Sequence, residues 1–196
     1  MVVTIPRGAA VVVWHAVFVP LFVSLPVALS RAGTRHGWQR GRPGPANLLG
    51  AVPIAAGGAL VASTVGCHYR AIPEGWKVEA RITPGYLLQK GPYAFSRNPM
   101  FLGQVTIWAG WAVFTGSLPV VVGLASFVGV WIIGSPFEER GLRKRFGAEY
   151  AAYRGRVPRL GHLGSTRGIP PTERRWTRGS GSRTIPDPNR DGSPWL

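Results

Sequence analysis

The chain has 196 residues, of which 45% are hydrophobic and 16% are charged, and its formal net charge is +15. Because an ordinary soluble domain is about 25% charged, and because the apolar residues are concentrated in a few long stretches, a conventional soluble protein is excluded. The single cysteine, Cys67, excludes an internal disulfide framework and a site of several thiolates, and the four scattered histidines form no metal motif.

Long uncharged stretches predict membrane spans. Residues 9–30 and 46–66 each approach the roughly 20 apolar residues that cross a hydrocarbon core of about 30 Å. A third stretch, from Met100 to Ser135, is too long for one span and contains a helix-breaking Gly-Ser-Leu-Pro tip at 116–119. We therefore predict an all-α integral membrane protein that ends in a helical hairpin. Its four expected transmembrane helices are 9–30, 46–66, 100–115 and 119–135.

An amphipathic segment, residues 137–160, follows the hairpin. Its apolar and aromatic positions recur at steps of three and four residues, and they are Leu142, Phe146, Tyr150, Tyr153 and Val157. The basic run 143–145 falls outside this stripe, which predicts a helix lying at the lipid interface. The composition of residues 161–196 (Gly, Ser, Thr, Pro and Arg) predicts a disordered basic tail. The expected regions are 1–66 with the first two helices, 67–160 with the functional core, and the tail.

The distribution of basic residues predicts the orientation. The amphipathic segment and the tail hold 13 Lys and Arg residues, so this end of the chain is expected in the cytoplasm. The connector 67–99 then faces the cytoplasm as well, and the uncharged hairpin tip faces the other side. The first loop disagrees, because it would carry Arg31, Arg35, Arg40 and Arg42 to the outside. Either this loop departs from the charge bias, or the second apolar stretch does not cross the membrane completely.

Two polar segments flank the hairpin, at residues 89–104 and 138–159. Since a two-helix hairpin returns the chain to the face that it left, we expect both segments on the same membrane face and close together. This is the physical reason for treating them as one site.

Both segments carry long motifs. KGPYAFSRNPMFLG, at 90–103, resembles the G-P-Y-x-x-x-R-H/N-P-M-Y-x-G motif of the integral-membrane methyltransferases, a group that includes isoprenylcysteine carboxyl methyltransferase and the phospholipid methyltransferases. EERGLRKRFGAEYAAYRGRVPR, at 138–159, is similar to their second motif, E-E-x-x-L-x-x-x-F-G-x-x-Y-x-x-Y-x-x-x-V-P-R. The resemblance covers about residues 86–160. The first two apolar stretches show no such signature.

This resemblance implies a methyltransferase that takes S-adenosylmethionine as methyl donor at the cytoplasmic end of the hairpin, with an acceptor that arrives from the membrane. The expected catalytic residues are Arg97, Asn98, Glu138 and Glu139. The expected cofactor-binding residues are Gln89, Lys90, Gly91, Pro92, Tyr93, Arg97, Asn98, Pro99, Gly103, Gln104, Glu138, Glu139 and Arg159. No metal is expected. Two positions depart from the common pattern, because Asn98 replaces His and cannot act as a base, and Phe101 replaces Tyr.

The chemistry of the donor agrees with these assignments. Its ammonium needs a carboxylate, Glu138 or Glu139, and its carboxylate needs donors such as Arg97 or Arg159. Adjacent residues of a helix point about 100° apart, so the two glutamates cannot face one ligand equally. We expect Glu138 to contact the cofactor and Glu139 to hold an arginine in place.

Structural roles compete with several of these assignments. The glutamates would also suit a helix N-terminus, and Arg97 would suit an interfacial anchor. Tyr150 and Tyr153 are expected to pack rather than to catalyse, and the adjacent Cys67 and His68 are expected to have no catalytic role.

Function remains open between two classes. The leading expectation is transfer of a methyl group to an isoprenoid-like carboxylate or thiol, or to a lipid amine; the alternative is a non-catalytic membrane scaffold or binding protein that keeps the fold. The basic residues flank apolar stretches, and no nucleic-acid-binding motif is present. We therefore expect anionic lipid headgroups as partners, and no nucleic acid.

Overall fold

The computed structural model describes residues 4–5, 7–71, 78–79 and 86–161. These residues all belong to one compact unit. The predicted disordered tail, apart from Gly161, lies outside the described residues.

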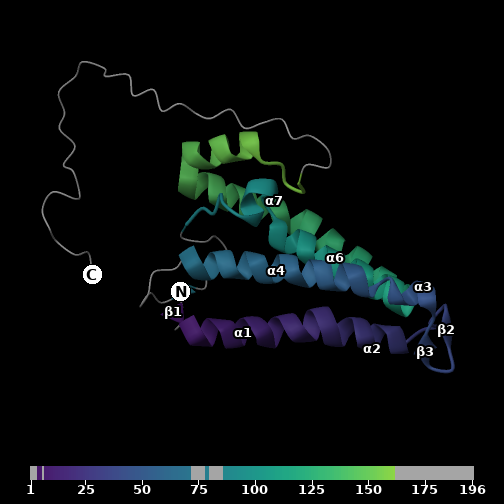
Figure 1. Ribbon diagram of the computed structural model, residues 1–196. Coiled ribbons are helices and arrows are strands. Elements are labelled where there is room, and N and C mark those ends of the chain that lie inside the picture. Colours follow the sequence, from purple (N-terminus) through teal and green to yellow (C-terminus); the bar gives the residue numbers. More distant parts are fainter. Residues whose placement is uncertain (1–3, 6, 72–77, 80–85, 162–196) are drawn as a thin grey trace, which may run out of the picture. The chain divides into compact units, whose positions relative to one another are not determined.

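Helices dominate the described chain (Figure 1). The helical elements are α1 (Arg7–Val19), the π-helical turn η1 (Pro20–Ser24), α2 (Leu25–Arg31), α3 (Pro45–Leu48), α4 (Ala51–Ala71), α5 (Pro92–Phe95), α6 (Pro99–Thr115) and α7 (Leu118–Arg156). Two antiparallel pairs of two-residue strands complete the elements: β1 (Thr4–Ile5) with β4 (Val78–Glu79), and β2 (Trp38–Gln39) with β3 (Arg42–Pro43). The fold is therefore the expected mostly helical one, with each predicted span on a helix.

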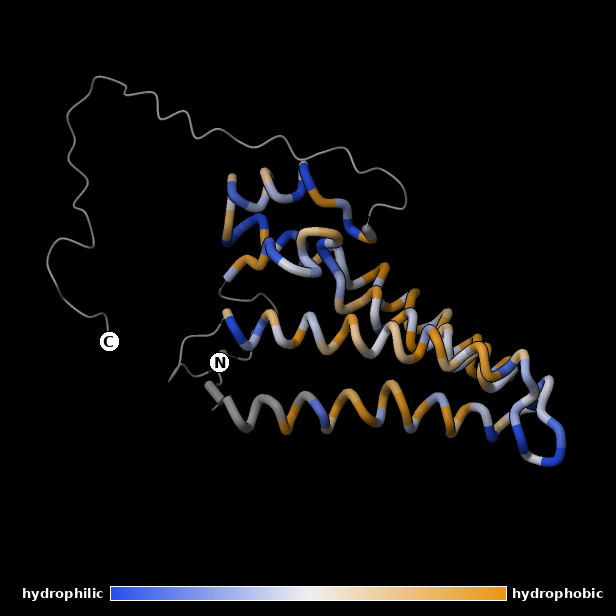
Figure 2. The backbone as a smooth tube through the Cα atoms, viewed as in Figure 1, coloured by the Kyte–Doolittle hydropathy of each residue, from blue (hydrophilic) through white to orange (hydrophobic). Residues whose placement is uncertain are grey.

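Two of the helical segments are long and apolar enough to cross a membrane, within the part of the chain that the structure describes. They are Pro45–Ala71 and Leu118–Arg156. The apolar segment His15–Arg31 and the 17-residue α6 are shorter. The apolar residues follow the middle of the helices, and polar residues gather at the helix ends (Figure 2). Two candidate spans are thus supported by length and composition, and the count of four stays a prediction.

Helices α4 and α6 pack with their backbones in contact. A Cβ atom at Gly57 would lie 2.5 Å from the carbonyl oxygen of Gly103, and one at Gly50 would lie 2.5 Å from the carbonyl oxygen of Gly110. Small residues allow this close approach, which is common between membrane helices. The contact fixes the end of α4 beside the beginning of α6.

The main apolar core lies where these two helices meet η1 and α7. Its buried members are Phe22, Val61, Ile107, Trp108 and Val120. The π-helical turn begins at a proline, whose missing N–H interrupts the helical hydrogen bonds. The indole of Trp111 donates a hydrogen bond to the carbonyl of Phe22 at 2.9 Å, so a side chain from α6 satisfies a backbone group of this turn.

The hairpin tip is confirmed where the sequence predicts it. Helix α6 ends at Thr115, Gly116 takes a left-handed conformation with φ of 58°, and α7 begins at Leu118. The N–H of His36 donates to the carbonyl of Gly116 at 3.1 Å. The first loop and the hairpin tip therefore lie at the same end of the bundle, which we call the loop end.

Helix α7 corrects the prediction for residues 137–160. No separate helix begins at 137, because α7 continues from Leu118 through Pro136, and a new helical segment follows only after the break at Gly147 (φ 48°, ψ −120°). Only glycine adopts this backbone conformation readily. After the break the chain folds back over the preceding turns (Figure 1).

The apolar stripe of this segment was predicted to face the lipid interface, and the structure places it elsewhere. Tyr150, Tyr153 and Val157 are buried together, and Leu87, Leu142 and Phe146 pack against them. The stripe therefore faces protein instead of lipid. The basic run 143–145 is exposed, as predicted.

Candidate functional site

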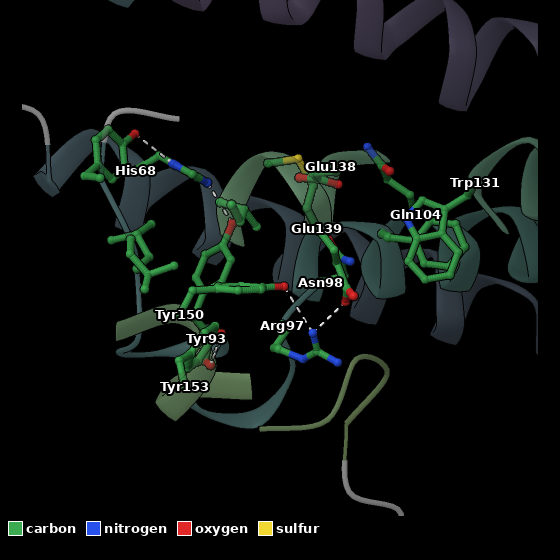
Figure 3. Close-up of a pocket in the computed structure, with 16 residues that line it drawn as sticks. His68, Tyr93, Arg97, Asn98, Gln104, Trp131, Glu138, Glu139, Tyr150 and Tyr153 are labelled. Carbon is green, nitrogen blue, oxygen red and sulfur yellow. Dashed lines mark hydrogen bonds and ion pairs between the residues drawn. The ribbon is translucent and has the colours of Figure 1, made fainter. Parts of the chain in front are cut away.

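A cavity of about 350 Å³ lies where α4 ends and α6 begins (Figure 3). Its walls come from the last turn of α4, the segment 86–93, the first turns of α6 and both parts of α7. The lining residues are His68, Tyr86, Leu87, Leu88, Tyr93, Arg97, Asn98, Met100, Phe101, Gln104, Trp131, Glu138, Glu139, Leu142, Tyr150 and Tyr153. The two polar segments that the sequence singled out thus meet in one site, as predicted.

Backbone hydrogen bonds join the two segments directly. The N–H of Arg97 donates to the carbonyl of Pro158 at 3.0 Å, and the buried Ser96 hydroxyl donates to the carbonyl of Arg159 at 2.8 Å. The same Ser96 oxygen accepts the N–H of Asn98 at 3.1 Å, just before α6 begins at Pro99. These bonds hold the Arg97–Asn98 turn at the mouth of α6.

Glu139 is the centre of a buried ion cluster. One of its carboxylate oxygens lies 2.5 Å from Nη1 of Arg97, and the other lies 2.8 Å from Nη2 of Arg159. Arg97 also donates to the Tyr150 hydroxyl at 3.1 Å. Burial raises the pKa of Glu139, but the hydrogen bonds and charges of Arg159 and Arg97 outweigh it, so the net pKa is lowered. Glu139 is therefore held as a carboxylate.

Glu138 differs from its neighbour. It lines the cavity and has no hydrogen-bond or ion-pair partner among the residues that the structure describes. Burial, and then the charge of Glu139, raise its pKa. A half-buried carboxylate that lacks a partner among the described residues loses part of its hydration without compensation, so this side chain is available to a cationic ligand. Glu139 thus holds two arginines, while both glutamates line the cavity, and the cofactor contact expected of Glu138 stays a prediction.

Arg97 retains free hydrogen-bonding capacity. Its side chain is only 10% exposed, and its buried Nε has no partner in the described part of the chain. A guanidinium has five N–H donors, and the contacts with Glu139 and Tyr150 both use Nη1. The remaining donors suit the carboxylate of a ligand.

A second polar group forms the opposite part of the cavity wall. The His68 ring lies between two tyrosines, with Nδ1 2.8 Å from the Tyr86 hydroxyl and Nε2 2.7 Å from the Tyr93 hydroxyl. The Tyr153 hydroxyl donates to the backbone carbonyl of Tyr93 at 2.7 Å. Burial raises the pKa of Tyr153 to about 12, so this phenol stays protonated as a donor.

Aromatic rings close the side of the cavity nearest the apolar core. The rings of Phe101 and Trp131 are stacked with centroids 3.8 Å apart, and Phe127 stacks on Phe101 at 5.6 Å. This wall offers an apolar, planar surface to a ligand.

The structure brings together six of the predicted site residues in the cavity wall: Tyr93, Arg97, Asn98, Gln104, Glu138 and Glu139. The other seven do not line it: Gln89, Lys90, Gly91, Pro92, Pro99, Gly103 and Arg159. Gln89 instead bonds Glu149 and Arg156 on the surface, and Gly103 faces α4. Arg159 supports Glu139 from outside the cavity. These positions shape the site without facing its interior.

Sequence reasoning missed several lining residues. His68 was available as a polar residue at the end of an apolar stretch, and Tyr86 lies shortly before the first motif. Tyr150 and Tyr153 belong to the second motif and do pack, as predicted, but they also bond Arg97 and Tyr93. Trp131 lies within a predicted span and gave no polar signal.

A comparison with family models gives a match to the phospholipid methyltransferase family over residues 47–149. The protein belongs to this family. The matched region includes α4, which the two motifs did not cover, together with α6 and most of α7. No curated protein and no solved structure matches the chain. Family membership makes the protein a membrane methyltransferase and agrees with its apolar helices.

Proposed function

We propose that the protein transfers a methyl group from S-adenosylmethionine to a lipophilic acceptor at the cavity between α4, α6 and α7. One observation carries this proposal: in a methyltransferase, the cavity contains a carboxylate, Glu138, that has no partner in the described part of the chain, beside a fixed ion cluster. The donor contains an ammonium, a carboxylate and a flat adenine ring. The cavity offers a complementary group for each of these.

In this proposal Glu138 accepts hydrogen bonds from the ammonium, and the free donors of Arg97 bind the carboxylate. The amides of Asn98 and Gln104 provide neutral donors and acceptors, and the Phe101–Trp131 stack provides an apolar surface. S-adenosylmethionine supplies an electrophilic methyl group. The contribution of the chain is to hold the two reactants in contact, and proximity of this kind accounts for a large part of catalysis.

The acceptor is proposed to enter from the membrane, because the cavity adjoins helices with apolar surfaces. Its reacting group is proposed to be one of three: a carboxylate or a thiol on an isoprenoid-like molecule, or a lipid amine. Nucleic acid is not a proposed partner. The exposed basic run 143–145 and the other surface arginines are proposed to contact anionic lipid headgroups.

The cavity and the C-terminus are proposed to face the cytoplasm, following the positive charge of this end. Helix α4 runs from the loop end to the cavity, since Gly50 contacts Gly110 and Cys67 lies next to Gly91. The first loop, with its four arginines, is therefore placed at the opposite end. Of the two alternatives raised by the sequence, we favour a loop that departs from the charge bias.

Direct binding tests the proposal. Calorimetry on the purified protein in detergent should give a dissociation constant for S-adenosylmethionine in the micromolar range, as is common for enzyme substrates. Incubation with a lipid extract and labelled donor should transfer label to a lipid fraction. A well-folded preparation that binds no S-adenosylmethionine would instead support the alternative of a scaffold that keeps the fold without the activity.

A further inference from the structure

A basic β-hairpin lies at the loop end, at the other end of α4 from the cavity (Figure 1). Strands β2 and β3 pair Gln39 with Arg42, and a two-residue turn, Arg40-Gly41, joins them. Beside this β-hairpin is a hollow of about 940 Å³, which is lined by Gly37, Gln39, Arg40 and residues 42–47. The two arginines of the lining are both exposed, so the hollow carries positive charge at its edge.

The base of the β-hairpin is fixed to the bundle. The Trp38 indole donates a hydrogen bond to the carbonyl of Phe114, near the end of α6, at 2.9 Å. The guanidinium of Arg35 lies over the Trp38 ring, 4.7 Å from its centre, and its Nε donates to the carbonyl of Ser30 at 3.1 Å. Arg35 is thus used within the fold, and the β-hairpin is an anchored support for the two arginines at its tip.

These two arginines have no carboxylate nearby to bind. The first acidic residue of the sequence is Glu74, and residues 80–137 contain none, so α1 to α4, α6 and the first half of α7 carry no negative side chain. Arg40 and Arg42 accordingly have no hydrogen-bond or ion-pair partner among the residues that the structure describes. The negative charge that balances the β-hairpin must therefore come from outside the described part of the chain.

The turn holds Arg40 in an unfavourable backbone conformation. Its φ of 49° lies in the left-handed region, and in the described part of the chain no other residue except glycine has a positive φ. Gly41 beside it has a φ of 76°. A two-residue turn with both φ angles positive favours Asn or Gly at its first position. An arginine at this strained position indicates that a positive charge at the tip has a function.

Exposed apolar side chains follow the β-hairpin directly in the chain. Leu48 is 53% exposed, and Leu49 and Val52, at the beginning of α4, are each 67% exposed. The polar β-hairpin thus lies at the end of apolar helices, as Figure 2 shows. Arginines next to exposed leucines suit the boundary of a membrane, where the guanidinium groups reach the headgroups and the leucines contact acyl chains. The occupant of the hollow should therefore have both an anionic and an apolar part.

We propose that the hollow beside the β-hairpin binds the headgroup of an anionic phospholipid, in the membrane leaflet opposite the cavity. The phosphate oxygens accept hydrogen bonds from Arg40 and Arg42, because a guanidinium matches the geometry of a phosphate, and the Gln39 amide lines the same hollow. The acyl chains lie against Leu48 and Leu49. The bound lipid supplies the missing negative charge, which accounts for a basic loop at the end where the charge bias predicts none. This inference goes beyond the proposed methyl transfer and does not depend on it.

The test measures lipid binding at the loop end itself. The full chain in a neutral detergent is titrated with dioctanoyl phosphatidylglycerol, and hydrogen exchange is followed in peptides that cover residues 35–44. We expect this lipid to slow exchange there, and dioctanoyl phosphatidylcholine and inorganic phosphate to leave it unchanged. The double variant Arg40→Gln/Arg42→Gln should weaken the binding roughly tenfold or more. The matched control, Arg70→Gln/Arg154→Gln, removes the same charge from exposed positions nearer the cavity and should bind within about twofold of the parent.

A second variant separates lipid binding from a structural role of the turn. Arg40→Gly removes the charge and relieves the left-handed backbone, so the lipid affinity should fall while the unfolding temperature stays at or above that of the parent. A fall in the unfolding temperature together with the affinity would make Arg40 a structural residue and overturn the inference.

Deletion of residues 165–196 tests whether the chain itself supplies the negative charge, because this segment contains Glu173, Asp187 and Asp191. The truncated chain should bind the lipid within about twofold of the parent, and a much tighter binding would show that the segment occupies the hollow and overturn the inference. Equal effects of the neutral lipid or of inorganic phosphate, or unchanged binding in the double variant, would also overturn it. None of these outcomes bears on the binding of S-adenosylmethionine at the cavity.

Discussion

The two ends of the helix bundle use polar side chains in different ways. At the loop end, the donors that are buried or half-buried bond backbone carbonyls: the Trp38 indole bonds the Phe114 carbonyl at 2.9 Å, and the Asn47 amide bonds the carbonyls of His36 and Val113, each at 3.1 Å. At the cavity end, polar side chains bond one another, as Arg97, Glu139 and Arg159 do.

This difference distinguishes polar side chains that stabilise the fold from polar side chains that build the site. Helix ends leave carbonyls without partners, and the loop end supplies those partners. The cavity end instead holds an ion cluster whose members restrain one another, beside a carboxylate that has no partner among the described residues. The unmatched group, rather than the density of polar residues, marks the site.

The largest expected effect comes from Glu139→Gln. Removing one charge from a buried ion cluster leaves Arg97 uncompensated, and breaking a buried pair costs about 3–5 kcal/mol. Thermal or denaturant unfolding in detergent should show this loss. Glu149→Gln is the control, because Glu149 is exposed and accepts only a surface bond from Gln89. Equal stability of the two variants would mean that the cluster does not hold the cavity together.

Glu138→Gln should act on binding instead of stability. A hydrogen bond to a charged group contributes about 1.5–3 kcal/mol, so the affinity for S-adenosylmethionine should fall roughly ten- to a hundredfold. The variant should be at least as stable to unfolding as the parent, since the carboxylate has no partner to lose among the described residues and the cost of desolvating its charge disappears. If both glutamate variants keep the parent affinity within about twofold, the pair is a helix-end charge feature, and the site is built from residues 89–104 alone.

The two glutamates should also differ in the pH at which each becomes protonated and loses its effect. Because the pKa of Glu138 is raised, its carboxylate becomes protonated first as the pH falls, and donor affinity should decrease on the order of tenfold per pH unit below that pKa. The pKa of Glu139 is lowered, so its stabilising contribution is present above the ordinary carboxyl pKa and is lost only as the pH falls through the lowered value. Calorimetry and thermal unfolding over a pH series should show binding lost before stability, and Glu138→Gln should show no pH-dependent loss of binding.

A substitution at the loop end should lower stability and leave donor affinity unchanged, the reverse of Glu138→Gln. Asn47→Ala leaves two carbonyls without their donor, which should cost about 1–3 kcal/mol of stability. The affinity for S-adenosylmethionine should stay within about twofold of the parent. Thr34→Ala, at an exposed position of the same loop, is the control for stability. A large loss of affinity in Asn47→Ala would show that the two ends are coupled.

The smallest effect is expected from deletion of residues 165–196. Their composition offers few apolar side chains to offset the entropy of ordering. Unfolding temperature and donor affinity should both remain those of the full chain. A marked fall in the unfolding temperature would show that this segment docks on the bundle.

The sequence predicted the parts of the molecule that depend on local pattern. Apolar length placed the helices, and Gly116 with Ser117 placed the hairpin tip. The position of the two motifs around a hairpin predicted that the two polar segments meet, and helical geometry predicted that one glutamate holds Arg97 or Arg159, as Glu139 does with both.

The remainder depended on tertiary contacts that no local pattern encodes. The stripe at Tyr150 and Tyr153 has the periodicity of a lipid-facing helix, and only the reversal at Gly147 turns it onto protein. His68 reaches the cavity because α4 packs along α6, which brings together residues that are 25 positions apart, as its bond to Tyr93 shows. Neither a Cys-His pair nor a lone glycine signals such contacts.

The glycine contacts between α4 and α6 have a mechanical consequence. Where two backbones touch, few side chains lie between them to rearrange, so these two helices should move together as one stiff body. His68, Asn98 and Gln104 then form a fixed half of the cavity. Any opening that admits a bulky acceptor or releases the methylated product must come from the other half, where α7 carries Trp131 and Glu138 and turns back at Gly147. The rigid half would set the register of the reactants, and the α7 half would set the rate at which they come and go.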